Sequence, residues 1–177
     1  MLIARRSMLL GAIAALPAAY AMPALALDAM PDSRFVGYTQ QVNDFEIASA
    51  NLALAKSTNE NIRGFANRMI ADHSNAAEEL AKSRQESGVS YAPDGASSPH
   101  TVAVLQRLNS LAGSDFDLAY ANAQLSILTE AEQQFGANSN ATSSGPSFTT
   151  GMARFAKREY PRIQGHREQA LALAARL

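Results

Sequence analysis

Side chains suited to a buried face recur at every third or fourth position along most of the sequence, which is the spacing of one side of an α-helix. We expect a first helix with Asp32 as its N-cap, and a second that restarts at residues 57–60 (Ser-Thr-Asn-Glu), which have capping-box spacing. The second should end near Gly88, a residue that suits a helix C-terminus. The positions on these two faces are Phe35, Tyr38, Val42, Phe45, Ala48 and Leu52, then Ile62, Phe65, Met69, His73, Ala76 and Leu80.

The second half of the sequence repeats the pattern. A Ser-Pro pair at residues 98–99 predicts a short helix that Gly113 ends, and residues 114–117 predict the cap of a third long helix. Residues 136–147 are rich in Gly, Asn and Ser and predict a loop, followed by a last helix that Pro161 should kink. The face positions are Val102, Leu105, Leu108 and Leu111, then Phe116, Tyr120, Ala123, Ile127, Ala131 and Phe135, then Phe148, Met152, Phe155, Ile163, His166, Ala170 and Leu173.

Strand-like alternation of apolar and polar residues is not sustained anywhere in the sequence. The pattern therefore predicts an all-α protein, a four-helix bundle with an extra short helix between the second and third long helices.

The start of the sequence has the features of an export signal. Two arginines at residues 5–6 precede an apolar run over about residues 8–19, and residues 24–26 (Ala-Leu-Ala) fit the A-x-A cleavage rule. We therefore expect a cleavable signal peptide at residues 1–26 and a single domain at residues 27–177, soluble in the periplasm. The paired arginines fit a twin-arginine signal as well as an ordinary secretory one. A membrane anchor is the alternative, although the run is shorter than the ~20 apolar residues that a span needs.

Composition narrows the possible chemistry. The 177 residues include 15 Lys and Arg, 16 Asp and Glu, and no Cys. A nearly neutral chain lacks the basic stripe of nucleic-acid-binding proteins, so no nucleic-acid partner is expected. Without Cys, disulfides, thiolate nucleophiles, zinc–thiolate sites and iron–sulfur clusters are excluded. The sequence also contains no Gly-x-Ser-x-Gly, phosphate-loop or dinucleotide-binding motif, and it identifies neither a protein partner in the envelope nor an oligomeric state.

Three polar residues lie on or beside the predicted buried faces: Glu46, His73 and His166. Imidazole and carboxylate groups are ligands for iron, zinc and manganese, and helical bundles hold metal ions between facing helices. With a rise of ~1.5 Å per residue, Glu46 and His73 lie at similar heights on either side of the turn at residues 57–60. These residues are therefore candidate ligands for one divalent transition-metal ion.

Each candidate also has a purely structural interpretation. His73 and His166 can be core histidines bonded to a carbonyl or carboxylate, and Glu46 can be a solvated border residue or a hydrogen-bond partner of His73. Asp72 lies ~100° around the helix from His73 and is expected to face outward. His100, at the start of the short helix, is expected to be exposed.

Four motifs in order carry a family resemblance. They are residues 45–47 (Phe-Glu-Ile), residues 66–73 (Ala-Asn-Arg-Met-Ile-Ala-Asp-His), residues 111–120 (Leu-Ala-Gly-Ser-Asp-Phe-Asp-Leu-Ala-Tyr), and Tyr160 and Pro161 with His166. Over about residues 32–173 the chain resembles the ferritin-like domain-of-unknown-function family four-one-four-two, a group of bacterial envelope proteins. The resemblance implies a ferritin-like fold.

The resemblance also implies functional positions at Glu46, Asp72 with His73, and His166. The chain departs from the family at Leu128, where a histidine is usual, so one potential ligand is absent. Ferritin-like di-iron enzymes repeat Glu-x-x-His on two helices, whereas isoleucines stand three residues before both histidines here. A di-iron centre is therefore not expected.

The sequence thus favours a non-enzymatic, ferritin-like envelope scaffold with a role in stress, as is often supposed for its relatives. The alternative is a mononuclear metal-binding protein that uses Glu46, His73 and His166. A metal-dependent oxidoreductase would need ligands that the sequence does not supply.

Overall fold

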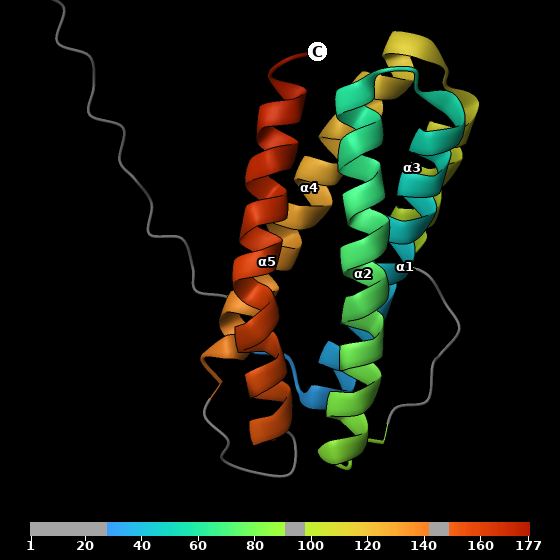
Figure 1. Ribbon diagram of the computed structural model, residues 1–177. Helices are drawn as coiled ribbons and strands as arrows, with labels where there is room; N and C mark the ends of the chain where they lie inside the picture. The colour runs from blue at the N-terminus through green and yellow to red at the C-terminus, as the bar shows by residue number, and fades with distance from the viewer. Residues whose placement is uncertain (1–27, 91–97, 142–148) are drawn as a thin grey trace, which may run out of the picture.

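The structure is a computed structural model that describes residues 28–90, 98–141 and 149–177, so the expected signal peptide at residues 1–26 lies outside the described residues. Every regular element in the described ranges is a helix: α1 (Asp32–Lys56), α2 (Glu60–Glu86), α3 (Pro99–Ser110), α4 (Gly113–Ser139) and α5 (Thr150–Ala174). The prediction of an all-helical chain, with a short helix between the second and third long ones, is confirmed (Figure 1). None of the described helices is long and apolar enough to span a membrane.

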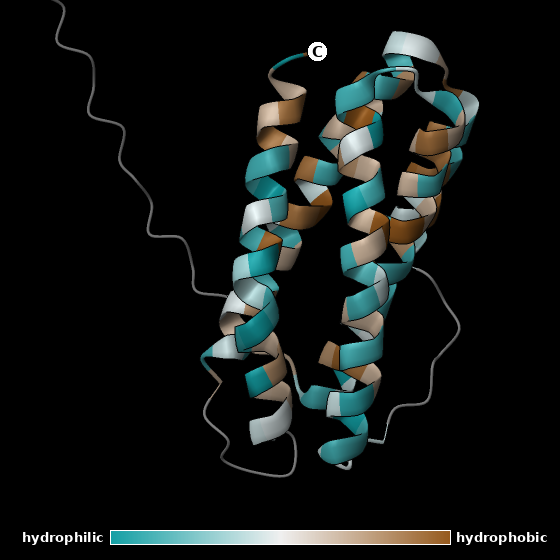
Figure 2. Ribbon diagram, viewed as in Figure 1, coloured by the Kyte–Doolittle hydropathy of each residue, from teal (hydrophilic) through white to brown (hydrophobic). Residues whose placement is uncertain are grey.

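The four long helices pack as a closed ring of neighbours. α1 packs most extensively on α2, and α4 on α5, while α2 also contacts α5 and α1 also contacts α4. The short α3 lies against α1 and α4 (Figure 1). Hydrophobic and hydrophilic residues alternate along every long helix, as expected of helices that bury one face (Figure 2).

The core consists of two clusters of buried apolar side chains. One cluster lies toward the turn between α1 and α2 and is built from Ala50, Ala53, Ile62, Phe65, Ala66, Met69, Leu108, Phe116, Tyr120, Ala121, Leu128, Ala170 and Leu173. The other occupies the opposite half and is built from Phe35, Val36, Val42, Leu80, Ala131, Phe135, Met152, Phe155, Ala156 and Ile163. In the second cluster the Phe35 ring makes edge contacts with Phe135 and Phe155, which ties α1 to α4 and α5.

Several helix ends match the sequence pattern. Ser98 caps α3 by accepting from the backbone N–H of His100, and Gly88 takes a positive φ of 64° just beyond the end of α2. α2 begins at the turn at residues 57–60, as predicted, but the residue whose side chain caps it is Asn59. α5 continues through Pro161 without interruption.

Three expected helix ends were wrong. Residues 114–117 do not cap the third long helix, because α4 begins at Gly113 and no side chain caps it. Asp32 does not cap α1, because it is the first helical residue and its carboxylate accepts the backbone N–H of Thr149 at 2.6 Å. That contact fastens the start of α1 to the start of α5. Gly113 opens α4 instead of ending α3, since its φ of 57° turns the chain into the next helix.

The loop expected at residues 136–147 begins later than predicted, since α4 continues to Ser139 and residues 142–148 lie outside the described residues. Gly136 and Asn138, which suggested a loop, instead pack inside the fold. A Cβ on Gly136 would lie 3.2 Å from the Tyr160 ring, so the small residue lets α4 approach α5 closely. The buried Asn138 amide bonds the backbone of Met30 in both directions, at 3.1 and 2.8 Å.

Two glycines of α5, Gly151 in its first turn and Gly165 in its interior, offer a test of this packing. A Cβ on Gly165 would meet no heavy atom within 4 Å, whereas one on Gly151 would lie 1.9 Å from the Ser87 Oγ. Since Gly costs a helix interior roughly 0.5–1 kcal/mol relative to Ala, Gly165→Ala should raise the free energy of unfolding by about that amount. Gly151→Ala should show a smaller gain or a loss, and urea denaturation followed by circular dichroism measures both. Equal gains for the two variants would contradict the close approach of α5 to Ser87.

Candidate functional site

Buried polar residues lie at the boundary between the two apolar clusters. On α1, α2 and α5 the boundary falls at Glu46, His73 and His166, whose exposed fractions are 0%, 2% and 3%. The three residues singled out from the sequence are therefore all buried, each on a different helix and in the middle of the ring of helices. The interpretation of Glu46 as a solvated border residue is thereby excluded.

His73 is held by one hydrogen bond from the neighbouring helix. Its Nδ1 lies 2.9 Å from the Oδ1 of Asn43, which is 2% exposed on α1. An amide oxygen only accepts, so in this arrangement Nδ1 carries the proton and donates, and Nε2 retains its lone pair. The Nε2 atom is buried and has no hydrogen-bond partner among the described residues.

His166 is held in the same manner but through its other ring nitrogen. Its Nε2 lies 2.8 Å from the Oδ2 of Asp72, so Nε2 donates to the carboxylate and the lone pair is on Nδ1. That Nδ1 is also buried and unpartnered within the described part of the chain. The expectation that Asp72 faces outward without a contact was wrong: its side chain is 32% exposed, yet its carboxylate reaches across from α2 to α5.

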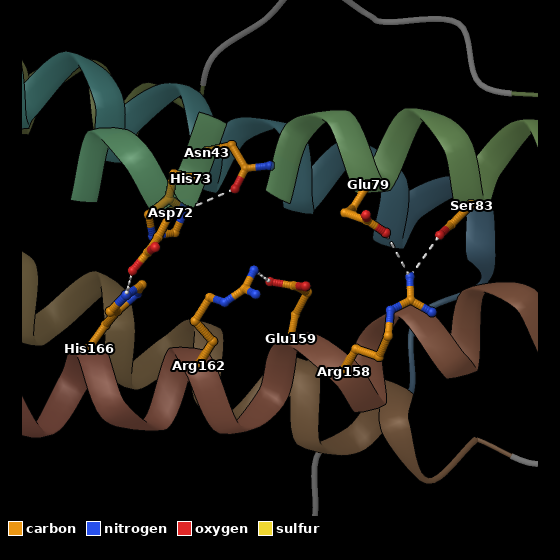
Figure 3. A network of polar contacts seen from close by, with 9 residues as sticks. All are labelled: Asn43, Asp72, His73, Glu79, Ser83, Arg158, Glu159, Arg162 and His166. Carbon is orange, nitrogen blue, oxygen red and sulfur yellow. Dashed lines mark hydrogen bonds and ion pairs between the residues drawn. The ribbon is translucent and has the colours of Figure 1, made fainter. Parts of the chain in front are cut away.

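The two imidazole rings are neighbours. Their centroids are 5.4 Å apart and their planes are tilted by 40°. Figure 3 shows His73 on α2 next to Asp72, with His166 facing them from α5 and Asn43 approaching from α1. The site thus contains two adjacent rings. In each ring one nitrogen is held by a hydrogen bond, and the other nitrogen has no partner among the described residues.

Burial keeps both rings neutral. It lowers the pKa of His73 to about 3, and the charge that His166 carries when it is protonated acts in the same direction, as does the charge of Arg162. Burial also lowers the pKa of His166, although the hydrogen bond and the charge of Asp72 offset part of that effect. Neutral imidazole is the form that binds a metal ion, so near pH 7 protons do not compete for the two free nitrogens.

Glu46 lies beside α4. Burial raises its pKa to about 8, and the Gln124 amide acts in the opposite direction. Neither carboxylate oxygen has a partner with hydrogen-bond geometry among the described residues, and the Gln124 amide donates to the Ser49 Oγ at 2.9 Å. Burial, and then the nearby charge of Glu46, raises the pKa of Tyr120. Near neutral pH the carboxyl group is therefore mainly protonated, a form that does not bind metal.

Charged groups continue from the histidines along the α2–α5 seam (Figure 3). Arg158 contacts Glu79 at 3.3 Å and Ser83 at 3.2 Å, and Arg162 pairs with Glu159 at 2.9 Å. These arginines and His166 recur every four residues, so they share one face of α5. The histidine pair is therefore the buried part of a polar seam between two helices, which continues on the other side with the hydrogen bond from Arg68 to Gln169.

The structure brings two of the three predicted ligands together. His73 and His166 are adjacent, whereas no group of three His, Cys, Asp or Glu side chains able to hold a metal ion is present in the described ranges. Sequence reasoning missed Asn43, which orients His73. The sequence did contain a signal for Asn43: it follows Val42, which lies on the predicted buried face of the first helix. A buried amide requires a polar partner inside the core.

Comparison with known proteins identifies a family whose function is unknown. A family model described as "Domain of unknown function (DUF4142)" matches residues 16–173. No curated protein and no solved structure matches the chain.

Proposed function

This chain belongs to the DUF4142 family, a domain of unknown function, and from that premise we propose that it is an exported, non-enzymatic metal-binding protein. In this proposal His73 and His166 hold one transition-metal ion inside a ferritin-like four-helix bundle. Export rests on the sequence pattern of residues 1–26, with cleavage after Ala26 and a periplasmic location for the domain at residues 27–177.

The observation that carries the proposal is the pair of unpartnered imidazole nitrogens. The Nε2 of His73 and the Nδ1 of His166 are buried lone-pair donors on adjacent rings. A buried polar atom without a partner costs about 1–3 kcal/mol, which a shared cation would offset. Histidines that bind metal almost always donate their other ring N–H to a carboxylate or carbonyl, as these two do to Asp72 and Asn43.

The separation of the rings also supports a single ion. Two imidazoles bound to one zinc ion at Zn–N distances of about 2.0–2.1 Å in tetrahedral geometry would place their centroids about 5 Å apart. The centroids of His73 and His166 are 5.4 Å apart. The ring separation is therefore compatible with binding of both imidazoles to one ion.

A structural scaffold is the second candidate. It is favoured by the hydrogen bonds to Asn43 and Asp72, which already satisfy one nitrogen of each ring. The scaffold role is also favoured because the described residues contain no group of three His, Cys, Asp or Glu side chains that could hold a metal ion. In this role the polar pair would specify how α1, α2 and α5 meet, and no ion would be bound.

Elemental analysis distinguishes the two candidates. Protein isolated from the periplasm without a His-tag, and then incubated separately with Zn²⁺, Co²⁺ or Ag⁺, should retain about one equivalent of at least one ion. His73→Ala and His166→Ala should each abolish retention. Asp72→Asn, which weakens only the bond that orients His166, should lower the affinity about 10–100-fold.

The matched control is His100→Ala, because His100 is exposed on α3 and lies outside the site. Circular dichroism checks that every variant is folded, and Asp72→Asn keeps the test informative if an alanine variant unfolds. Retention below about a tenth of an equivalent of every ion would contradict metal binding and leave the scaffold role. Unchanged retention in folded His73→Ala would place the ion elsewhere.

A further inference from the structure

A soft donor lies beside the histidine pair. Met69 is four residues before His73 on α2, so the two side chains are neighbours on one face, with Cβ atoms about 5–6 Å apart. Helical side chains lean toward the helix N-terminus, which places the His73 ring over the turn that carries Met69. The bond from Nδ1 to Asn43 turns the opposite edge of the ring, with Nε2, away from that residue.

Met69 lies in the core. Its side chain is fully buried and belongs to the same apolar cluster as Ala170, which is one helical turn beyond His166. The Met69 thioether is therefore part of the apolar cluster that adjoins the imidazole pair along both α2 and α5. Thioether sulfur is a soft, uncharged donor that selects Cu(I)-type ions over hard cations.

The charges around this position do not favour a dication. The imidazole and thioether groups are uncharged donors, and the described residues contain no group of three His, Cys, Asp or Glu side chains that would add an ionised ligand. Among the charged side chains nearby, Asp72 and Glu159 are balanced by two arginines, Arg68 and Arg162. The cost of moving an ion from water into a poorly polarisable interior scales with the square of its charge, so a dication is penalised about four times as strongly as a monocation.

On the basis of the proposed metal-binding function, we propose that the ion is a soft monovalent d¹⁰ cation of the Cu(I) and Ag(I) type, and that the Met69 sulfur is a third ligand beside His73 and His166. The site then needs no ionised ligand. This replaces the divalent ion expected from the sequence, and it assigns a binding role to a methionine that the apolar pattern places in the core.

Competition titrations with Ag⁺ and Zn²⁺ test this assignment on the protein isolated from the periplasm. Ag⁺, which is redox-inert, should bind with a stoichiometry of one and at least about tenfold more tightly than Zn²⁺. Met69→Leu nearly conserves side-chain volume, so the variant should fold. It should weaken Ag⁺ binding about tenfold or more and change Zn²⁺ binding much less.

Met152→Leu is the matched control, because Met152 is equally buried but lies in the other apolar cluster. It should bind Ag⁺ like the unmodified protein. X-ray absorption of the Cu(I)-loaded protein should show one sulfur neighbour, absent in Met69→Leu.

The possible failures are distinguishable. Zn²⁺ binding as tight as Ag⁺ binding, or an Ag⁺ affinity unaffected by Met69→Leu, would overturn the soft-ion assignment and leave the proposed function intact. Binding of neither ion would overturn both.

Discussion

The contribution of His73 to the free energy of unfolding of the metal-free protein is expected to fall by several kcal/mol as the pH falls from 6.5 to about 3. Burial lowers the pKa of His73 from 6.5 to about 3, so the unfolded chain takes up a proton that the folded chain excludes. The resulting stability is complete above pH 6.5 and is lost as the pH falls, at about 1.4 kcal/mol per pH unit for each such group. His166, whose pKa is also lowered by burial, should steepen the loss.

Urea denaturation at a series of pH values, in the presence of a chelator, measures this dependence. His73→Leu removes the titrating ring. In acid it should reduce the slope of the free energy of unfolding against pH by the amount that corresponds to about one bound proton. His100→Leu, at an exposed position of α3, serves as the control and should retain the slope of the unmodified protein. If His73→Leu and the unmodified protein lose stability in parallel, the exclusion of a proton from the folded His73 would be wrong.

The sequence was sufficient to predict the helices because their signal is local. A buried face repeats every three or four residues, and the residues that carry it, such as Phe35, Leu80 and Phe155, are buried where the periodicity places them. The helix ends were harder to predict because a short polar residue can serve either its own helix or a distant one. Asp32 has the chemistry of a cap, and the structure uses that chemistry on Thr149, the residue directly before α5.

The same contrast applies to the site. His73 and His166 were found because a polar side chain on an apolar stripe requires compensation inside the core. Their partners depend on how the helices are rotated about their axes, and spacing along one helix does not contain that information. Asp72 therefore appeared to face outward from α2, yet α5 lies close enough for His166 to bond it. Asn43 reaches His73 by the same kind of interhelical contact.

The buried polar residues have opposite dependences on pH. The histidines stabilise the fold increasingly as the pH rises to 6.5, whereas Glu46, whose pKa is raised from 4.5 to about 8, stabilises it less as the pH rises above 4.5. Between pH 4.5 and pH 6.5 the two trends offset each other. We therefore expect a plateau of stability in that interval, with the histidines causing the fall on the acid side and Glu46 the fall on the alkaline side.

Glu46→Gln is expected to raise the free energy of unfolding above pH 8 by on the order of 4 kcal/mol, and to change it little near pH 4.5. The amide has nearly the same shape as the carboxylic acid and cannot ionise, so the variant avoids placing an unpaired charge in the core. Glu78→Gln, at an exposed position of α2, is the matched control and should follow the unmodified protein at every pH. Denaturation curves at pH values on both sides of 8 measure the difference. A constant offset between Glu46→Gln and the unmodified protein at all pH values would contradict the raised pKa and show that the buried carboxylate has a partner that stabilises its charge.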